Sequence, residues 1–130
     1  MTIRYLAFED VLYLAARIGE PTPRDVGLVE SAVARPRTTV FGEDAYPDVH
    51  DKAAALLHSL ARNRAFVHGN KRASWLAAGA FYWINGFELD ARDGPAYELV
   101  IGAATGALDV PEIAQILRTS VRPRTSPDPS

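Results

Sequence analysis

A run of polar residues just before an apolar segment carries the clearest chemical signal in this sequence. Asn70, Lys71 and Arg72 stand at the predicted start of a helix, and Gly69 precedes them. Unpaired backbone N–H groups at a helix start attract anions, whereas the helix dipole disfavours cations there by roughly 0.3 to 1 kcal/mol. We therefore expect a phosphate or similar anion to bind at residues 69–72. An ordinary helix with Asn70 as its N-cap and solvated charges explains the same residues equally well.

Two further candidates for chemistry, Arg64 and His68, lie just upstream. A guanidinium stays protonated at physiological pH, so Arg64 can bind or orient a phosphate but cannot accept a proton. Imidazole titrates near neutral pH, so His68 has the chemistry of a base. Phe66 stands between them and is expected to be a hydrophobic anchor that fixes this segment to the core.

The other histidines give weaker signals. His58 lies within an apolar helical pattern and is expected to be a hydrogen-bonded core residue. His50 stands close to Asp48 and Asp51, but nothing else in the sequence supports a metal site, and we expect none. The chain has no cysteine and no motif typical of zinc, P-loop or serine-hydrolase enzymes.

Helical segments are predicted to position these residues. The expected ranges are 7–18, 26–35, 50–62, 71–85, 95–105 and 110–119, from apolar spacing and from stop and start signals. Helix 71–85 should be central to the bundle, because its sequence is apolar on every side. Residues 36–47 combine β-type residues with a turn, which predicts a short β-hairpin or flap.

Length and composition fit one compact domain over residues 1–120. The 130 residues are 48% hydrophobic and carry a formal net charge of −2. Residues 121–130 are rich in proline and poor in apolar side chains, which predicts a disordered tail. The charge gives no reason to expect direct nucleic-acid binding, and no segment is apolar over the about 20 residues that a membrane span needs. The N-terminus lacks the pattern of a signal peptide, so we expect a cytoplasmic protein.

The segment Phe66-x-x-Gly69-Asn70-Lys71-Arg72, set between two predicted helices, resembles the signature loop of the Fic/Doc (Fido) superfamily. It is most similar to the Doc (death-on-curing) branch, in which the loop has the sequence His-x-Phe-x-Asp-Gly-Asn-Lys-Arg. Segments at 28–36, 42–47 and 52–63 extend the similarity, which covers about residues 3–118. The resemblance implies an all-α Fido-type bundle of about six helices. It also implies a toxin of a toxin–antitoxin pair, with an antitoxin protein as partner.

The resemblance implies phosphoryl transfer from ATP to a protein hydroxyl, a threonine of elongation factor Tu. Gly69, Asn70, Lys71 and Arg72 match the residues that bind the nucleotide phosphates. However, Arg64 stands where the family has its general-base histidine. His68 stands where the family has the acidic residue that helps to hold Mg²⁺, and imidazole is a poor ligand for that hard cation.

Two interpretations explain these departures. In the first, the loop has lost its chemistry, and we expect little or no transfer because a general base must lie within about 3 Å of its proton. In the second, Arg64 supplies the positive charge that a metal would bring, and His68 supplies the base. The alternative function is a non-catalytic or repurposed Fido domain that binds a nucleotide, a phosphate-bearing small molecule or a partner helix.

Overall fold

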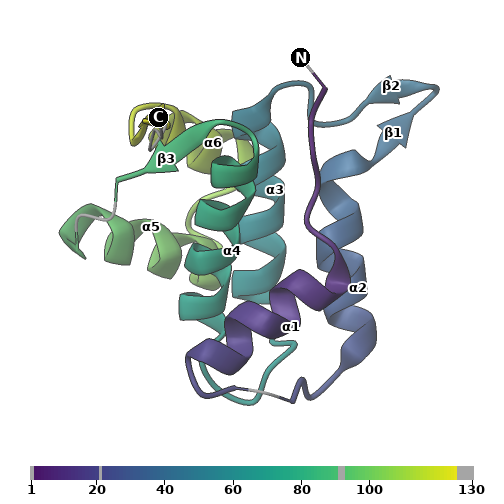
Figure 1. Ribbon diagram of the computed structural model, residues 1–130, viewed down its shortest axis with the longest axis vertical. Coiled ribbons are helices and arrows are strands. Elements are labelled where there is room, and N and C mark those ends of the chain that lie inside the picture. The colour runs from purple at the N-terminus through teal and green to yellow at the C-terminus, as the bar shows by residue number, and fades with distance from the viewer. Residues whose placement is uncertain (1, 21, 91–92, 126–130) are drawn as a thin grey trace, which may run out of the picture.

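The computed structural model describes residues 2–20, 22–90 and 93–125. Within them, the helices are α1 (Phe8–Arg17), α2 (Val26–Ala34), α3 (Val49–Arg62), α4 (Asn70–Ile84), α5 (Asp93–Thr105) and α6 (Val110–Arg118), and a 3₁₀ turn, η1 (Arg35–Arg37), follows α2. The short strands form two antiparallel pairs, β1 (Thr39–Val40) with β2 (Glu43–Asp44) and β3 (Phe87–Leu89) with β4 (Val121–Pro123). The predicted all-α bundle with a hairpin inside 36–47 is confirmed (Figure 1).

Helices α3 and α4 run side by side through the middle of the molecule (Figure 1). Their contact is built from small side chains with larger apolar ones between them, so the two backbones approach closely. The buried apolar residues of the pair are Ala53, Ala54, Ala55, Leu56, Leu57, Leu60 and Ala61 in α3 and Ala73, Ala77, Ala78, Phe81 and Tyr82 in α4. This core fixes both ends of the segment that connects the two helices.

Helix α4 is central, as predicted, but its apolar sequence is not covered on every side. Trp83 is 45% exposed, and Trp75 and Leu76 are only partly covered. The reason is that α1 and α5 pack against α4 without closing over the strip between them, which leaves cavities beside Trp75. One apolar face of α4 therefore remains open.

The C-terminal segment differs from the predicted disordered tail in its first residues. Val121–Pro123 pair with β3, and Arg122 forms an ion pair with Glu88 at 3.0 Å. Arg124 then stacks over the Trp83 ring at 4.9 Å and donates a hydrogen bond to the Trp83 carbonyl. These partners are remote in sequence, so composition alone could not reveal them. Residues 126–130 lie outside the described residues.

The polar loop and the flap lie at opposite ends of α3 (Figure 1). The flap precedes the first turn of α3, and the loop follows its last turn; about 20 Å of helix separates them. In the described ranges, no helix is both long and apolar enough to cross a membrane.

Candidate functional site

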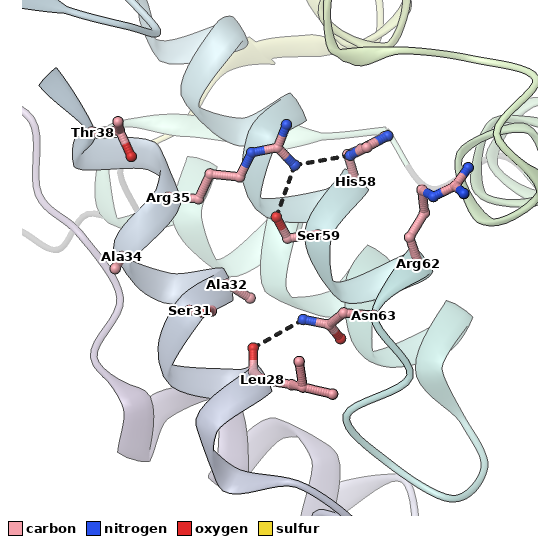
Figure 2. A pocket seen from close by; sticks show the side chains of 10 residues that line it. All are labelled: Leu28, Ser31, Ala32, Ala34, Arg35, Thr38, His58, Ser59, Arg62 and Asn63. Atoms are coloured by element: carbon pink, nitrogen blue, oxygen red, sulfur yellow. Dashed lines mark hydrogen bonds between the residues drawn. The ribbon is translucent and has the colours of Figure 1, made fainter. Parts of the chain in front are cut away.

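Two asparagines hold the backbone of the loop between α3 and α4. Asn63 donates from Nδ2 to the Leu28 carbonyl at 2.9 Å (Figure 2), and its Oδ1 accepts from the Ala65 N–H at 3.1 Å. Asn70 closes the other end, because its Oδ1 accepts from the Phe66 N–H at 2.9 Å and its Nδ2 donates to the Phe66 carbonyl at 2.8 Å. Both amide groups therefore serve the loop backbone.

The connection between α1 and α2 supports the loop from outside. The N–H groups of Arg24 and Asp25 donate to the Ala65 carbonyl at 2.7 and 3.1 Å. The Arg24 guanidinium donates to the Arg64 carbonyl from Nε at 3.1 Å and from Nη2 at 2.5 Å. Arg64 has φ 55°, a left-handed conformation that costs an L-residue about 1–2 kcal/mol. These hydrogen bonds, with the buried Phe66 ring (1% exposed), hold Arg64 in that conformation.

The start of α4 corrects one prediction. Gly69, and not Asn70, is the N-cap, and Asn70 is the first helical residue because its side chain is bonded to the loop. Glycine is favoured here, since φ is 76° and an added Cβ would lie 2.9 Å from Glu20 Cγ, so that the Glu20 side chain would have to move. The first helical hydrogen bond runs from the Ala73 N–H to the Gly69 carbonyl at 2.8 Å. Within the described part of the chain, the N–H groups of residues 70–72 thus have no acceptor.

A pocket of about 310 Å³ opens over this helix start. The structure brings all but one of the predicted site residues to it: Arg64, His68, Gly69, Asn70, Lys71 and Arg72, with Ala61, Val67 and Ala104 completing the wall. Phe66 is the exception, since it lies in the core below the loop. The pocket therefore combines exposed cationic side chains with a helix N-terminus.

The charges around the pocket are not balanced by neighbours. Arg64, Lys71 and Arg72 form no ion pair with any carboxylate in the ranges that the structure describes. Unpaired N–H groups at a helix start and uncompensated cations are groups to which anions bind, which keeps the anion site predicted from the sequence as a candidate. Glu20 lies against Gly69 and is the carboxylate brought to this loop by the α1–α2 connection. Neither Glu20 nor Arg24 had a local sequence signal, because both reach the loop only through the fold.

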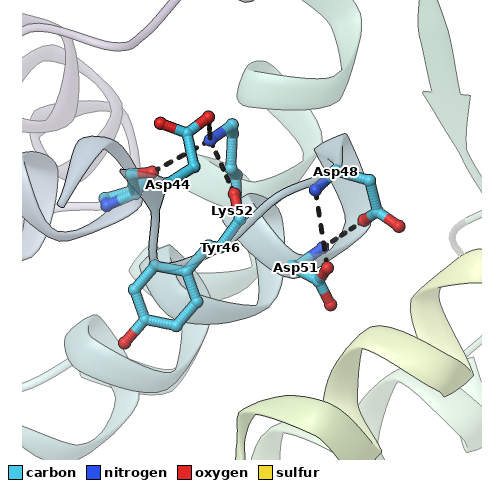
Figure 3. A network of polar contacts seen from close by, with 6 residues as sticks. Asp44, Tyr46, Asp48, Asp51 and Lys52 are labelled. Carbon is cyan, nitrogen blue, oxygen red and sulfur yellow. Dashed lines mark hydrogen bonds and ion pairs between the residues drawn. The ribbon is translucent and has the colours of Figure 1, made fainter. Parts of the chain in front are cut away.

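The flap is anchored by one buried lysine that sequence reasoning also missed. Lys52 is 1% exposed, and its Nζ donates to the Tyr46 carbonyl at 2.6 Å, to Asp44 Oδ2 at 3.2 Å and to the Pro36 carbonyl at 3.5 Å (Figure 3). At the tip of the flap, the Phe41 side chain is fully exposed. The Lys52 ammonium group therefore joins three residues at the base of the hairpin.

His50 has a structural partner. Its Nδ1 lies 2.9 Å from the Tyr82 hydroxyl, and its ring packs edge-on against Phe87. Burial lowers the pKa of His50, and Arg118 lowers it further, while the two aspartates nearby oppose the shift. Burial also raises the pKa of the Tyr82 hydroxyl. The pair is therefore a neutral hydrogen bond between α3 and α4.

Comparison with known proteins agrees with the family resemblance of the loop sequence. A sequence model described as "Fic/DOC family" matches residues 5–82. This chain belongs to the Fic/Doc family. The "Toxin Doc" of Mycolicibacterium smegmatis is 51% identical over 114 residues, which are 85% of this chain and 88% of that protein. The "Protein kinase doc" of Escherichia phage P1 is 33% identical over 101 residues, 77% of this chain and 78% of that protein.

The similarity confirms the Doc branch that the residues from Phe66 to Arg72 indicated. In this Doc-like chain, the two variant positions, Arg64 and His68, open onto the same pocket as Lys71 and Arg72. The loop backbone is thus held by Asn63, Asn70 and Arg24, while Arg64 and His68 present their side chains to the pocket.

Proposed function

We propose that this protein is a Doc-like toxin whose loop binds the phosphates of ATP. The start of α4 supports this most strongly, because unpaired N–H groups at residues 70–72 and the cations Arg64, Lys71 and Arg72 face one pocket of about 310 Å³. A triphosphate is the biological anion that matches this concentration of donors and positive charge. The inherited reaction is transfer of the terminal phosphate to a protein hydroxyl, with elongation factor Tu as the target by family resemblance. ATP and that target place the proposed activity in the cytoplasm.

We infer that the chain as it stands transfers little or no phosphate. In the transfer, the target oxygen bonds to the terminal phosphorus, ADP leaves, and a base takes the hydroxyl proton. Arg64 occupies the position of that base and remains protonated, so it can hold a phosphate but cannot take the proton. His68 opens onto the same pocket, but it is four residues along the loop and replaces the acidic residue expected to help hold Mg²⁺.

The same two residues favour a second candidate function. A Fido domain that binds a nucleotide or another phosphate-bearing molecule needs the helix start, Lys71 and Arg72, but no base. Arg64 adds a further permanent positive charge to such a site. Tight nucleotide binding without turnover would distinguish this function from a toxin kinase.

An antitoxin is the partner that we propose, and the open face of α4 is where its helix would bind. Trp75 and Leu76 line two adjoining cavities of about 440 and 420 Å³, one bordered by α5 and the other by α1 and β3. Tyr97, 69% exposed, stands at the rim of the first. An apolar groove of this kind receives the apolar face of an amphipathic helix. Co-expression with a small neighbouring reading frame should yield a complex that survives size exclusion; separate elution would contradict the pairing.

Transfer of labelled terminal phosphate from ATP to elongation factor Tu tests the proposed chemistry. We expect the chain as it stands to be inactive and the double variant Arg64→His with His68→Asp to be active, with a gain of about 10²- to 10⁴-fold from the base alone. Activity in the original chain that His68→Ala abolishes would show that the two roles have been exchanged. If neither form acts on protein while a small-molecule reaction needs Arg64 or His68, the domain has been repurposed.

ATP binding is measured separately by calorimetry. Lys71→Ala and Arg72→Ala should each weaken it, because each removes a cation next to the unpaired N–H groups. No heat of binding at millimolar ATP, with folded protein, would exclude the proposed nucleotide site.

A further inference from the structure

A second pocket, of about 530 Å³, lies between α2 and α3. It shares no lining residue with the pocket over the start of α4. Three basic side chains line it (Figure 2): Arg35 from η1 reaches His58 of α3, and Arg62 of α3 lies on the far side of His58 from Arg35. Ser59 accepts a hydrogen bond from Arg35, and Asn63 lines the other end of the pocket.

Arg35 is held in place entirely by neutral groups. Its Nε donates to the Tyr46 hydroxyl at 2.9 Å, and its Nη1 donates to Ser59 Oγ and to His58 Nδ1, both at 2.9 Å. A guanidinium has no acceptor atom, so His58 Nδ1 must accept and the ring proton of the neutral imidazole sits on Nε2. No partner occupies Nη2 of Arg35 in the described part of the chain.

Arg62 supplies a second uncompensated charge. Its guanidinium packs against Gly106 in the turn before α6, where an added Cβ would collide with it. Among residues 2–20, 22–90 and 93–125, Arg62 has neither a hydrogen bond nor an ion pair. Burial, then the charges of Arg35 and Arg62, lower the pKa of His58, and Asp109 opposes them. Arg35 and Arg62 thus both line one cavity, and neither forms an ion pair in the described part of the chain, so both charges would stabilise an anion bound there.

We propose that this pocket is a second phosphate-binding site, which takes a phosphate group of a small molecule between Arg35 and Arg62. Arg35 donates to one phosphate oxygen from Nη2, its remaining free nitrogen, and the planar fork of the Arg62 guanidinium suits bidentate binding of the others. The hydrogen bonds to Tyr46, His58 and Ser59 orient Arg35 in advance. The site does not depend on the proposed function, because none of its residues belongs to the signature loop pocket.

Nuclear magnetic resonance of the three histidines tests the proposal without an activity assay. The experiment uses the Lys71→Ala, Arg72→Ala double variant, which weakens the loop site, and titrates inorganic phosphate against sodium chloride of equal ionic strength. We expect a saturable shift of the His58 ring signal and a rise in the His58 pKa, because a bound anion offsets the charges of Arg35 and Arg62. The signal is assigned by its absence in His58→Gln.

Arg62→Gln and Arg35→Lys should each weaken phosphate binding by about tenfold or more. Arg17→Gln, which removes an exposed arginine of α1, is the matched control and should leave phosphate binding unchanged.

ADP that binds more tightly than inorganic phosphate would identify a nucleotide as the source of the phosphate group; equal affinity would show that the site recognises the phosphate group alone. The proposal is overturned if His58 responds equally to chloride, or if Arg62→Gln leaves the titration unchanged. It is also overturned if phosphate binds the original chain but not the Lys71→Ala, Arg72→Ala variant. That result would locate the binding at the loop and would not contradict the proposed function.

Discussion

The signature loop and the flap are both irregular segments that flank α3, but they are held in different ways. The loop is fixed at several points, by Asn63, by Asn70 and by Arg24 from the α1–α2 connection. The base of the flap is fixed by Lys52, whose Nζ carries hydrogen bonds to the Tyr46 carbonyl and to Asp44. The flap also receives the hydrogen bond from Arg35 Nε to the Tyr46 hydroxyl, but Lys52 joins three of its residues, Pro36, Asp44 and Tyr46, through one side chain.

This difference separates the residues that hold the loop backbone from those that line its pocket. The side chains of Arg64 and His68 form no hydrogen bond with the rest of the described chain, so the frame does not depend on them. Asn63 and Asn70 build the frame and are the residues on which its shape depends. In the flap, by contrast, a change at Lys52 alone should alter the segment.

The largest expected effect on stability comes from breaking the loop frame. Asn70→Ala removes the acceptor for the Phe66 N–H and the donor for the Phe66 carbonyl, and each partly buried group left unpaired costs about 1–3 kcal/mol. We expect urea unfolding to show a loss of at least about 2 kcal/mol. Asn70→Asp keeps the acceptor and should lose less. An unchanged midpoint for Asn70→Ala would contradict the role of this amide.

Breaking the flap anchor should have a smaller and more local effect. Lys52→Met keeps the apolar stem but leaves the Tyr46 carbonyl without its donor, at a cost of about 1–3 kcal/mol, and the bond to the Pro36 carbonyl, at 3.5 Å, is too long to add much. Asp44, whose side chain is 51% exposed, stays solvated and adds little. Hydrogen exchange should speed up at the Ala45 N–H, which bonds across the hairpin to Thr38, and not at the Phe66 N–H of the loop. Equal acceleration at both amides would show that the two segments are not independently held.

The double variant Arg64→His with His68→Asp tests whether the side chains that line the pocket contribute to the stability of the loop. Both side chains are exposed, so we expect the free energy of unfolding to stay within about 0.5 kcal/mol of the original while transfer activity appears. Thermal and urea unfolding check the first half of this prediction. A large loss of stability would mean that these side chains do support the frame.

The smallest expected effect is on the pH dependence of the free energy of unfolding. The folded-state pKa of His50 is lowered, chiefly by burial, so the folded protein binds this proton less well than the unfolded chain does. The resulting stability is fully present above the unfolded pKa near 6.5 and is lost as pH falls through the lower, folded value. His50→Gln should flatten that part of the stability–pH curve. His58 shifts in the same direction, so some slope should remain in this variant.

The sequence determined the helices and the location of the site. Apolar spacing together with start and stop signals identified the helices, because both kinds of signal are local in sequence. The run from Gly69 to Arg72 identified both the helix start and the family, because residues that bind one anion at a helix N-terminus must be adjacent in sequence.

Only the tertiary structure decided how the site is held. Arg24 reaches the Arg64 carbonyl from 40 residues away, and Asn63 reaches Leu28 across 35 residues. Asparagine is a favourable N-cap, and the sequence therefore suggested Asn70 for that position. In the structure Gly69, with φ 76°, is the N-cap, and the Asn70 amide instead forms hydrogen bonds with the Phe66 backbone. Contacts between residues so far apart depend on how the helices pack against one another, and the spacing of residues within one segment does not predict that packing.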